Sequence, residues 1–294
     1  MRVCFGPRDL GFPGDNLGPM RASRPDEHPE LLRDRMSGDG YLWLRDTLPR
    51  ADVLAARQVI LEHMAAREVL SPGKPIMEGV MPRGGRGMPM NGRRGIAHHP
   101  QVLKVMEHEA LYSFLETWYG EAALTLHFKW LRAVGNEAYT GAHMDYVYMG
   151  RGSSRLQTVW IPLGDIPVGQ GTLAVCAGSH RTEGFARIRD TYGRMDVDRD
   201  GVEGWFSRDP LELSSRHGGS WRSTDFRAGD VVIFGMHLMH ASTTNLTQRF
   251  RLSCDVRFQP ASDPVDPRWV RDGVGHVDGP PRKTMAQARS EWRV

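Results

Sequence analysis

The sequence predicts a mainly β protein with helical buttresses, whose core is a jelly roll or a related double-sheet barrel. In the first part of the chain apolar residues recur at helical spacing, and later they alternate with polar ones. The later runs are short and are joined by Gly-rich turns, as in all-β cores. We find no internal repeat. We therefore expect a single domain over residues 1–294, with a largely helical part at 1–120, the β core at 121–260 and a tail at 261–294.

The first part of the chain alternates between irregular and helical patterns. Residues 1 to about 30 are rich in Gly, Pro and Asp without periodicity, which predicts an irregular arm. A short helix is expected at 30–36 and a strand at 40–45. Helical spacing of apolar residues predicts a surface helix at 52–69 and helical structure again at 100–119.

Residues 72–95 are dense in Gly, Pro, Met and Arg. Their central Pro-Arg-Gly-Gly-Arg-Gly run is similar to RGG-type RNA-binding segments, but it is short and has no interleaved aromatic residues, which favours a connecting loop. A third interpretation is a loop near the mouth of a substrate site, where Met side chains adapt to an apolar ligand.

Strict alternation predicts a half-buried strand at 124–130, with His127 and Lys129 on its polar side. These two side chains could reach a bound molecule or lie in solvent. Further strands are expected at 156–163, 172–177, 230–240 and 249–258.

Residues 184–227 read as polar and irregular, and the segment 181–226 is long for a connection inside a compact core. It contains Trp205 and Trp221, which fit a lid over a substrate and the packing of a long insertion equally well.

The composition excludes several classes of protein. The chain has 38 Lys and Arg against 35 Asp and Glu, a surplus too small to indicate nucleic acid or an anionic membrane as partner. Cys4, Cys176 and Cys254 form no CxxC motif and indicate a reducing compartment. Neither a membrane-spanning run nor the apolar core of a signal peptide is present. We expect a cytoplasmic protein that acts on a small molecule, with its oligomeric state left open.

The chemistry-bearing residues centre on His143 and Asp145. On a strand, residues two apart project from one face, so an imidazole nitrogen and a carboxylate oxygen could reach one metal. The best third ligand is His240. Two His and one carboxylate form the facial triad of non-haem Fe(II) oxygenases, which leaves the other metal positions open. We call these three residues the triad. His237 is the rival for the distal position, although Ser and Asn do not follow it as they follow His240.

Arg251 lies eleven residues after His240 on a strand whose residues alternate between apolar and polar. One face of this strand therefore packs and the other lines a polar space. A guanidinium inside a barrel needs an anion, and its planar fork suits a carboxylate. Trp160 adds an aromatic side chain near the same space.

The motifs occur in an order that resembles the phytanoyl-CoA dioxygenase family of Fe(II)/2-oxoglutarate-dependent oxygenases. The motifs are His143-x-Asp145, Trp160 to Asp165, Gly171 to Leu173, Gly178-Ser-His180, Gly229-Asp230, His240-x-Ser242 with Asn245, and Arg251. The resemblance covers about residues 124–260 and, more loosely, the part from Gly40. It implies a double-stranded β-helix, a cupin-like jelly roll, which agrees with the strand pattern.

The resemblance also implies roles for these residues. The triad would bind Fe(II) as the catalytic centre, Arg251 and Ser242 would hold the distal carboxylate of 2-oxoglutarate, and Trp160 would pack beside this cosubstrate. His180 and Asn245 fit turn-stabilising roles. With O2, such an enzyme hydroxylates an unactivated C–H bond and releases succinate and CO2, and the carboxylate of Asp145 favours hydroxylation over halogenation.

Two other function classes stay open on the sequence alone. A cupin-like metal enzyme of another type, such as an isomerase or epimerase, would not need Arg251. A metal-binding protein without catalysis would bind iron and leave 2-oxoglutarate unconsumed. The sequence does not identify the primary substrate.

Overall fold

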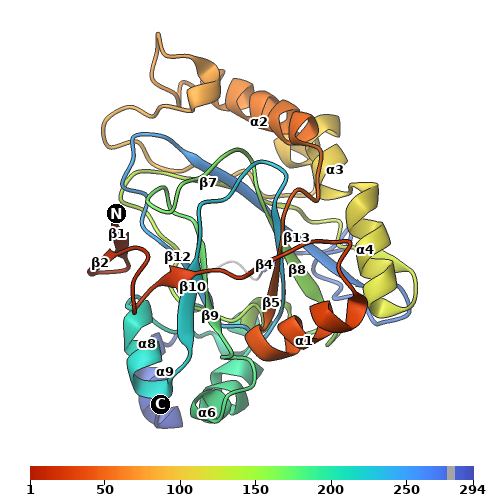
Figure 1. The fold of residues 1–294 in the computed structure, drawn as a ribbon, viewed down its shortest axis with the longest axis vertical. Coiled ribbons are helices and arrows are strands. Elements are labelled where there is room, and N and C mark those ends of the chain that lie inside the picture. Colours follow the sequence, from red (N-terminus) through yellow and green to blue (C-terminus); the bar gives the residue numbers. More distant parts are fainter. Residues whose placement is uncertain (277–281) are drawn as a thin grey trace.

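The computed structural model describes residues 1–276 and 282–294. Its centre is formed by two β-sheets (Figure 1). The larger sheet has the strand order β4-β5-β11-β8-β13-β6, with β7 also paired to β13, and the smaller has the order β12-β9-β10-β3. No sheet of the described residues closes on itself, and the two sheets pack face to face, as in a jelly roll.

The larger sheet contains β4 (Ala22–Ser23), β5 (Tyr41–Leu44), β6 (Ala123–Thr125), β7 (Trp130–Val134), β8 (Gln157–Pro162), β11 (Val231–Gly235) and β13 (Arg251–Pro260). The smaller contains β3 (Gly18–Pro19), β9 (Leu173–Ala177), β10 (Ser220–Ser223) and β12 (His240–Ser242). The inner faces meet in an apolar cluster that includes Trp160 and Phe234 of one sheet and Leu173 and Val175 of the other.

The alternation in β13 separates a packed face from a polar one. Leu252, Cys254, Val256 and Phe258 belong to an apolar cluster with helices α2 (Arg50–Ala65), α3 (Pro100–Met106) and α4 (Glu109–Tyr119). Figure 1 shows these helices along one side of the sheets. The residues between them, Arg251, Ser253, Asp255 and Arg257, point toward the smaller sheet, and three of these line a cavity between the sheets.

The outer face of the smaller sheet is covered by the later part of the chain. Cys176, Trp221 and Ala241 pack with residues from α6 (Ala186–Asp190), α8 (Pro210–His217) and α9 (Met285–Trp292). The remaining helices are α1 (Pro29–Asp39), α5 (Tyr146–Met149) and α7 (Val197–Asp200), with short 3-10 turns at Ile76–Glu78, Gly95–His98, Glu183–Phe185 and Tyr192–Arg194. The prediction of an irregular stretch at 184–227 is therefore wrong, because it contains short helices and the strand β10.

The prediction of an irregular N-terminal arm is also wrong. β1 (Arg2–Phe5) and β2 (Arg8–Gly11) form an antiparallel hairpin. Val3 and Phe5 are fully buried against the later helices, while Arg2 is exposed and Cys4 is partly exposed. Two apolar residues are too few to give a visible period in the sequence.

The predicted strand at 124–130 is split into β6 and β7, and the chain turns between them. Lys129 is buried, and its Nζ lies 2.6 Å from Oε1 of Glu107 and donates to the carbonyl of Leu126 at 2.8 Å. Lys129 therefore serves packing, and solvation on a polar strand face is the wrong interpretation.

The loop at 72–95 runs along the edge of the core, where Val80, Pro89 and Gly92 form single bridges to core residues. Part of the predicted tail, residues 277–281, lies outside the described residues. Among the residues the structure describes, no helix has both the length and the apolar character needed to cross a membrane. The single-domain organisation stays a prediction.

Candidate active site

The triad is brought together by a pairing between two distant segments. His240 begins β12, and the backbone N–H groups of His143 and His240 each donate to the other's carbonyl at 2.9 Å. Asp145 has turned into helical conformation (φ −64°, ψ −23°) at the start of α5. The prediction of one strand carrying both His143 and Asp145 is therefore wrong. The side chains still converge, because Oδ1 of Asp145 lies 3.9 Å from Nε2 of His143 and 3.8 Å from Nε2 of His240.

Both imidazoles are oriented by backbone carbonyls. Nδ1 lies 2.8 Å from the Gly141 carbonyl in His143 and 3.0 Å from the Leu238 carbonyl in His240. A carbonyl can only accept, so Nδ1 carries the proton and Nε2 keeps its lone pair. Burial lowers the pKa of His143 to about 3 and also lowers the pKa of His240. Both rings are therefore neutral at pH 7, as metal ligands require.

The carboxylate of Asp145 is fixed through its other oxygen. Oδ2 accepts a hydrogen bond from Oγ1 of Thr158 at 2.5 Å and lies 3.2 Å from Nη2 of Arg257. Burial alone would raise the pKa of Asp145, but the charge of Arg257 and the hydrogen bond from Thr158 oppose it, and this pKa lies below its usual range. Oδ1 is left facing the two ring nitrogens, and the three candidate ligand atoms lie within 4.8 Å of one another. This donor set fits a divalent iron.

The same cavity continues from the triad to Arg251, which is 2% exposed. Its Nη1 donates to Oγ of Ser253, while its Nε has no hydrogen-bond partner among the described residues. Burial lowers the pKa of Arg251 to about 10, so the group stays charged at pH 7. Ser242 and Trp160 line the cavity beside it, and Ser242 accepts the N–H of Thr140 at 2.8 Å, which leaves its own proton free to donate. A buried guanidinium with a free edge fits a carboxylate.

Sequence reasoning missed part of this cavity. Nε of Arg132 donates to Oδ2 of Asp255 at 2.6 Å, and Nη1 of Arg257 lies 3.9 Å from the same oxygen. The alternation in β13 already placed Asp255 and Arg257 on its polar face. Arg132 was missed because the expected strand ended at residue 130, and Thr158 because nothing in its own segment indicates a contact with Asp145.

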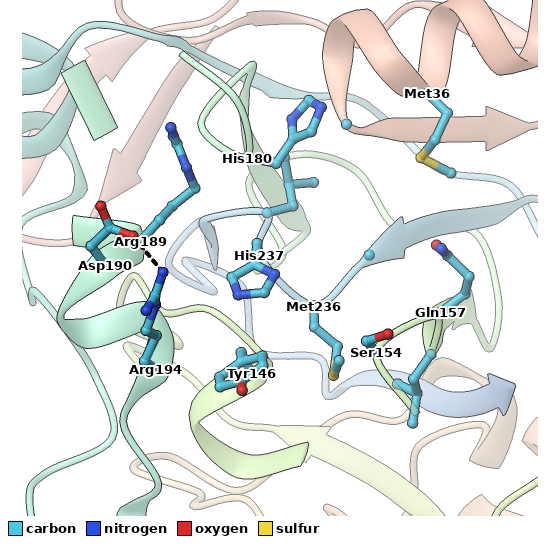
Figure 2. A pocket seen from close by; sticks show the side chains of 14 residues that line it. Met36, Tyr146, Ser154, Gln157, His180, Arg189, Asp190, Arg194, Met236 and His237 are labelled. Carbon is cyan, nitrogen blue, oxygen red and sulfur yellow. Dashed lines mark hydrogen bonds and ion pairs between the residues drawn. The ribbon is translucent and has the colours of Figure 1, made fainter. Parts of the chain in front are cut away.

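His237 lies in a second cavity, of about 700 Å³, whose lining includes none of the triad. Figure 2 shows its ring there beside Tyr146, and the two ring centroids are 4.7 Å apart. Nε2 of His237 lies 3.1 Å from the Gly193 carbonyl, and Nε2 of His180, at the edge of the same cavity, lies 3.0 Å from the Ser37 carbonyl. The rival distal ligand is therefore on the outside of the core.

The two tryptophans of the segment 181–226 lie in different surroundings. Trp221 is buried and packs edge-on against Phe5 at 5.0 Å, so it serves packing. Trp205 lies against Gly141, where an added Cβ would come within 2.7 Å of the indole, so it adjoins the loop that carries His143. Asn245 donates to the carbonyls of Val134 and Arg249, which agrees with a turn-stabilising role.

Comparison with known proteins identifies the family. The phytanoyl-CoA dioxygenase (PhyH) family matches residues 36–253. The chain belongs to the phytanoyl-CoA dioxygenase family. This dioxygenase therefore depends on Fe(II), 2-oxoglutarate and O2, and the His-Asp-His triad of its cavity provides a site that could hold the iron.

Curated relatives include hydroxylases. The chain is 28% identical over 265 residues to the 1-deoxypentalenic acid 11-beta-hydroxylase of Streptomyces exfoliatus, covering 79% of this chain and 83% of the relative. The corresponding hydroxylase of Streptomyces arenae is 26% identical over 260 residues, with the same coverage of both chains.

Solved structures share the fold. The epimerase SnoN, in complex with Fe3+, alpha ketoglutarate and nogalamycin RO, has a TM-score of 0.59 and 19% identity, covering 86% of this chain and 92% of SnoN. EctD from S. alaskensis in its apoform has a TM-score of 0.56 and 19% identity, covering 92% of this chain and 89% of EctD. At these identities the likeness concerns the jelly-roll fold.

Proposed function

We propose that this dioxygenase hydroxylates an unactivated C–H bond of a small organic substrate at iron held by His143, Asp145 and His240. The observation that carries the proposal is that the two carboxylate oxygens of Asp145 have different contacts. One oxygen faces both imidazole nitrogens, while Thr158 and Arg257 hold the other. Such a carboxylate is pre-oriented to bind a metal through one oxygen, so it leaves metal positions open for cosubstrate and O2.

Arg251 is proposed to anchor the C5 carboxylate of 2-oxoglutarate, with Ser242 donating to the same group and Trp160 packing beside the carbon chain. The unpartnered Nε of Arg251, buried at the far end of the triad's own cavity, supports this role. When bound, iron and 2-oxoglutarate activate O2 with release of succinate and CO2 and supply the oxidant for the C–H bond. The protein orients the substrate and 2-oxoglutarate and limits the access of water to the cavity.

Hydroxylation is favoured over halogenation because Asp145 fills the ligand position that a halide would need. The hydroxylase activity named for the Streptomyces relatives supports the same outcome. A cytoplasmic location fits the three free cysteines, two of them buried. The proposed partner is a small-molecule substrate, without nucleic acid or membrane.

The test is a substrate-panel assay with Fe(II), 2-oxoglutarate and O2 that includes 1-deoxypentalenic acid. We expect one compound to raise succinate release and to gain one oxygen atom by mass spectrometry, and reactions without 2-oxoglutarate to show neither. A product of unchanged mass and inverted configuration would indicate epimerisation. Iron binding without succinate formation in any reaction would support a metal-binding protein without catalysis.

A further inference from the structure

The cavity around the triad carries more positive than negative charge. In the described part of the chain its lining contains three guanidinium groups, Arg132, Arg251 and Arg257, and two carboxylates, Asp145 and Asp255. The triad histidines add no charge, because an imidazole that binds a metal is neutral. A divalent iron and a doubly charged 2-oxoglutarate cancel each other. One positive charge therefore remains, and an uncompensated charge in a buried site is costly.

Arg257 is the buried cation that faces the triad. Its residue is 4% exposed, and its guanidinium carbon lies 5.0 Å from the ring centroid of Trp130. Nη2 is engaged with Asp145 at 3.2 Å. Nε and Nη1 have no hydrogen-bond partner among the described residues, and Asp255 at 3.9 Å is too distant to provide one. Buried polar groups rarely stay unsatisfied, so these two donors indicate a missing acceptor.

Arg132 is the more exposed neighbour of Arg257, whose side chain is only 4% exposed. The side chain of Arg132 is 36% exposed, and its Nε holds Asp255 at 2.6 Å. Its backbone forms a bridge to Pro89, so the loop at 72–95 lies beside Arg132. An anion entering from solvent would meet Arg132 before it reaches Arg257. Arg251 lies six residues from Arg257 along β13 and is the proposed anchor of the cosubstrate.

We propose that the primary substrate is an organic monocarboxylic acid whose carboxylate binds between Arg132 and Arg257. This inference rests on the proposed function and adds the substrate class. A single negative charge neutralises the excess, whereas the several charges of a phosphate ester or an acyl-CoA thioester would exceed it. Tyr148, whose ring centroid is 5.8 Å from that of His143 and which lines a neighbouring pocket, offers an aromatic surface for an apolar remainder.

The test measures binding without turnover. The protein is loaded with Zn(II), which uses the same ligand types without redox chemistry, and with 2-oxoglutarate. Benzoate, phenylacetate, cyclohexanecarboxylate and decanoate, each beside its neutral primary amide, are titrated by ligand-observed NMR. For at least one pair we expect the acid to bind the wild type about tenfold more tightly than its amide, as a charge-assisted hydrogen bond allows.

Arg132 is the residue to change, because it does not contact the triad as Arg257 does. In Arg132→Met the acid-to-amide preference should fall to about one, and in Arg132→Lys most of it should remain because the charge is kept. Arg155→Met is the matched control. This arginine pairs with Asp263 and Glu121 away from the cavity, so its loss should leave the preference unchanged.

The outcomes distinguish a failure of the carboxylate inference from a failure of the proposed oxygenase function. If the wild type binds Zn(II) and 2-oxoglutarate but no acid binds better than its amide, the carboxylate inference is wrong and the oxygenase proposal stands. This includes the case in which no compound binds. A preference that survives unchanged in Arg132→Met also overturns it, since the carboxylate would then be held somewhere other than between Arg132 and Arg257. If the wild type binds neither metal nor 2-oxoglutarate, both proposals fail.

Discussion

In two pairs of histidines burial lowers the pKa of every ring, but the surroundings of the two pairs differ. His143 and His240 lie inside the core, with ring centroids 4.1 Å apart. His180 and His237 line the outer cavity of Figure 2. In the inner pair the backbone carbonyls take Nδ1, and Nε2 of each ring faces Asp145. In the outer pair the carbonyls take Nε2 instead.

The difference shows that a carboxylate and a free Nε2 make a metal site, and that a buried histidine alone does not. The outer cavity also has a carboxylate, Asp190, but it is exposed and paired with Arg194 at 2.9 Å. Asp145 is buried, and its pairing with Thr158 and Arg257 leaves one oxygen turned to the rings. Two consecutive residues line the two different cavities, because Asp145 faces the inner cavity and Tyr146 faces the outer one.

The largest loss of activity is expected when the inner pair of histidines loses its buried carboxylate. Asp145→Ala removes the carboxylate and leaves two imidazoles. We expect coupled succinate formation to fall by more than about 100-fold, beyond the cost of losing an outer-shell partner, and iron to bind more weakly. Asp145→Glu keeps the charge on a longer arm and should retain part of the activity.

Thermal stability, iron content and succinate formation should be measured on the same preparations of these variants. If Asp145 had only a structural role, Asp145→Ala would lose stability and keep normal turnover per folded molecule. A folded Asp145→Ala protein with full iron and undiminished turnover would remove the basis of the triad assignment.

The second effect concerns the far end of the inner cavity. Arg251→Ala should raise the 2-oxoglutarate concentration needed for half-maximal rate by about 10- to 100-fold, the loss of a charge-assisted pair worth about 1.5–3 kcal/mol. Arg251→Lys should raise it less, because it keeps the charge but not the fork. Iron binding should be nearly unchanged in both. Equal cosubstrate requirements in all three proteins would assign the anchor to another cation of the cavity.

A smaller effect is expected from the residue that orients Asp145. Thr158→Val keeps the shape of the side chain but removes the hydroxyl that donates to Oδ2. We expect iron affinity or turnover to fall by about tenfold, the lower part of the range for outer-shell partners. Thr158→Ser restores the donor and should recover most of the loss. Iron titration of the three proteins would show whether recovery follows the hydroxyl, and a Val variant with normal affinity would mean that Arg257 alone holds the carboxylate.

The smallest effect is expected in the outer pair. His237→Gln removes a ring that stacks on Tyr146 and contacts the Gly193 carbonyl. We expect the free energy of unfolding to change by no more than about 1.5 kcal/mol, the worth of one hydrogen bond, with unchanged iron content and turnover. Denaturant unfolding and succinate assays measure the two quantities. Loss of iron in this variant would contradict the conclusion that only the inner pair belongs to the metal site.

The sequence predicted the fold class and the triad's composition because both follow from local patterns. Alternation in residues 249–258 separates the packed face from the cavity face, and His240 precedes Arg251 at family spacing. The partners of Asp145 could not be predicted, since Thr158 and Arg257 lie 13 and 112 residues away and approach it only through the fold. The hairpin of β1 and β2 and the buried Lys129 were also missed, because distant residues bury them against local preference.

The most direct measurement is a crystal structure grown anaerobically with Fe(II) and 2-oxoglutarate, with anomalous data collected at the iron absorption edge. The structure predicts one strong peak within coordination distance of Nε2 of His143, Oδ1 of Asp145 and Nε2 of His240. Electron density for 2-oxoglutarate should extend from this peak to Arg251. A peak in the outer cavity beside His180 and His237, or iron at the triad with 2-oxoglutarate bound away from Arg251, would contradict the account.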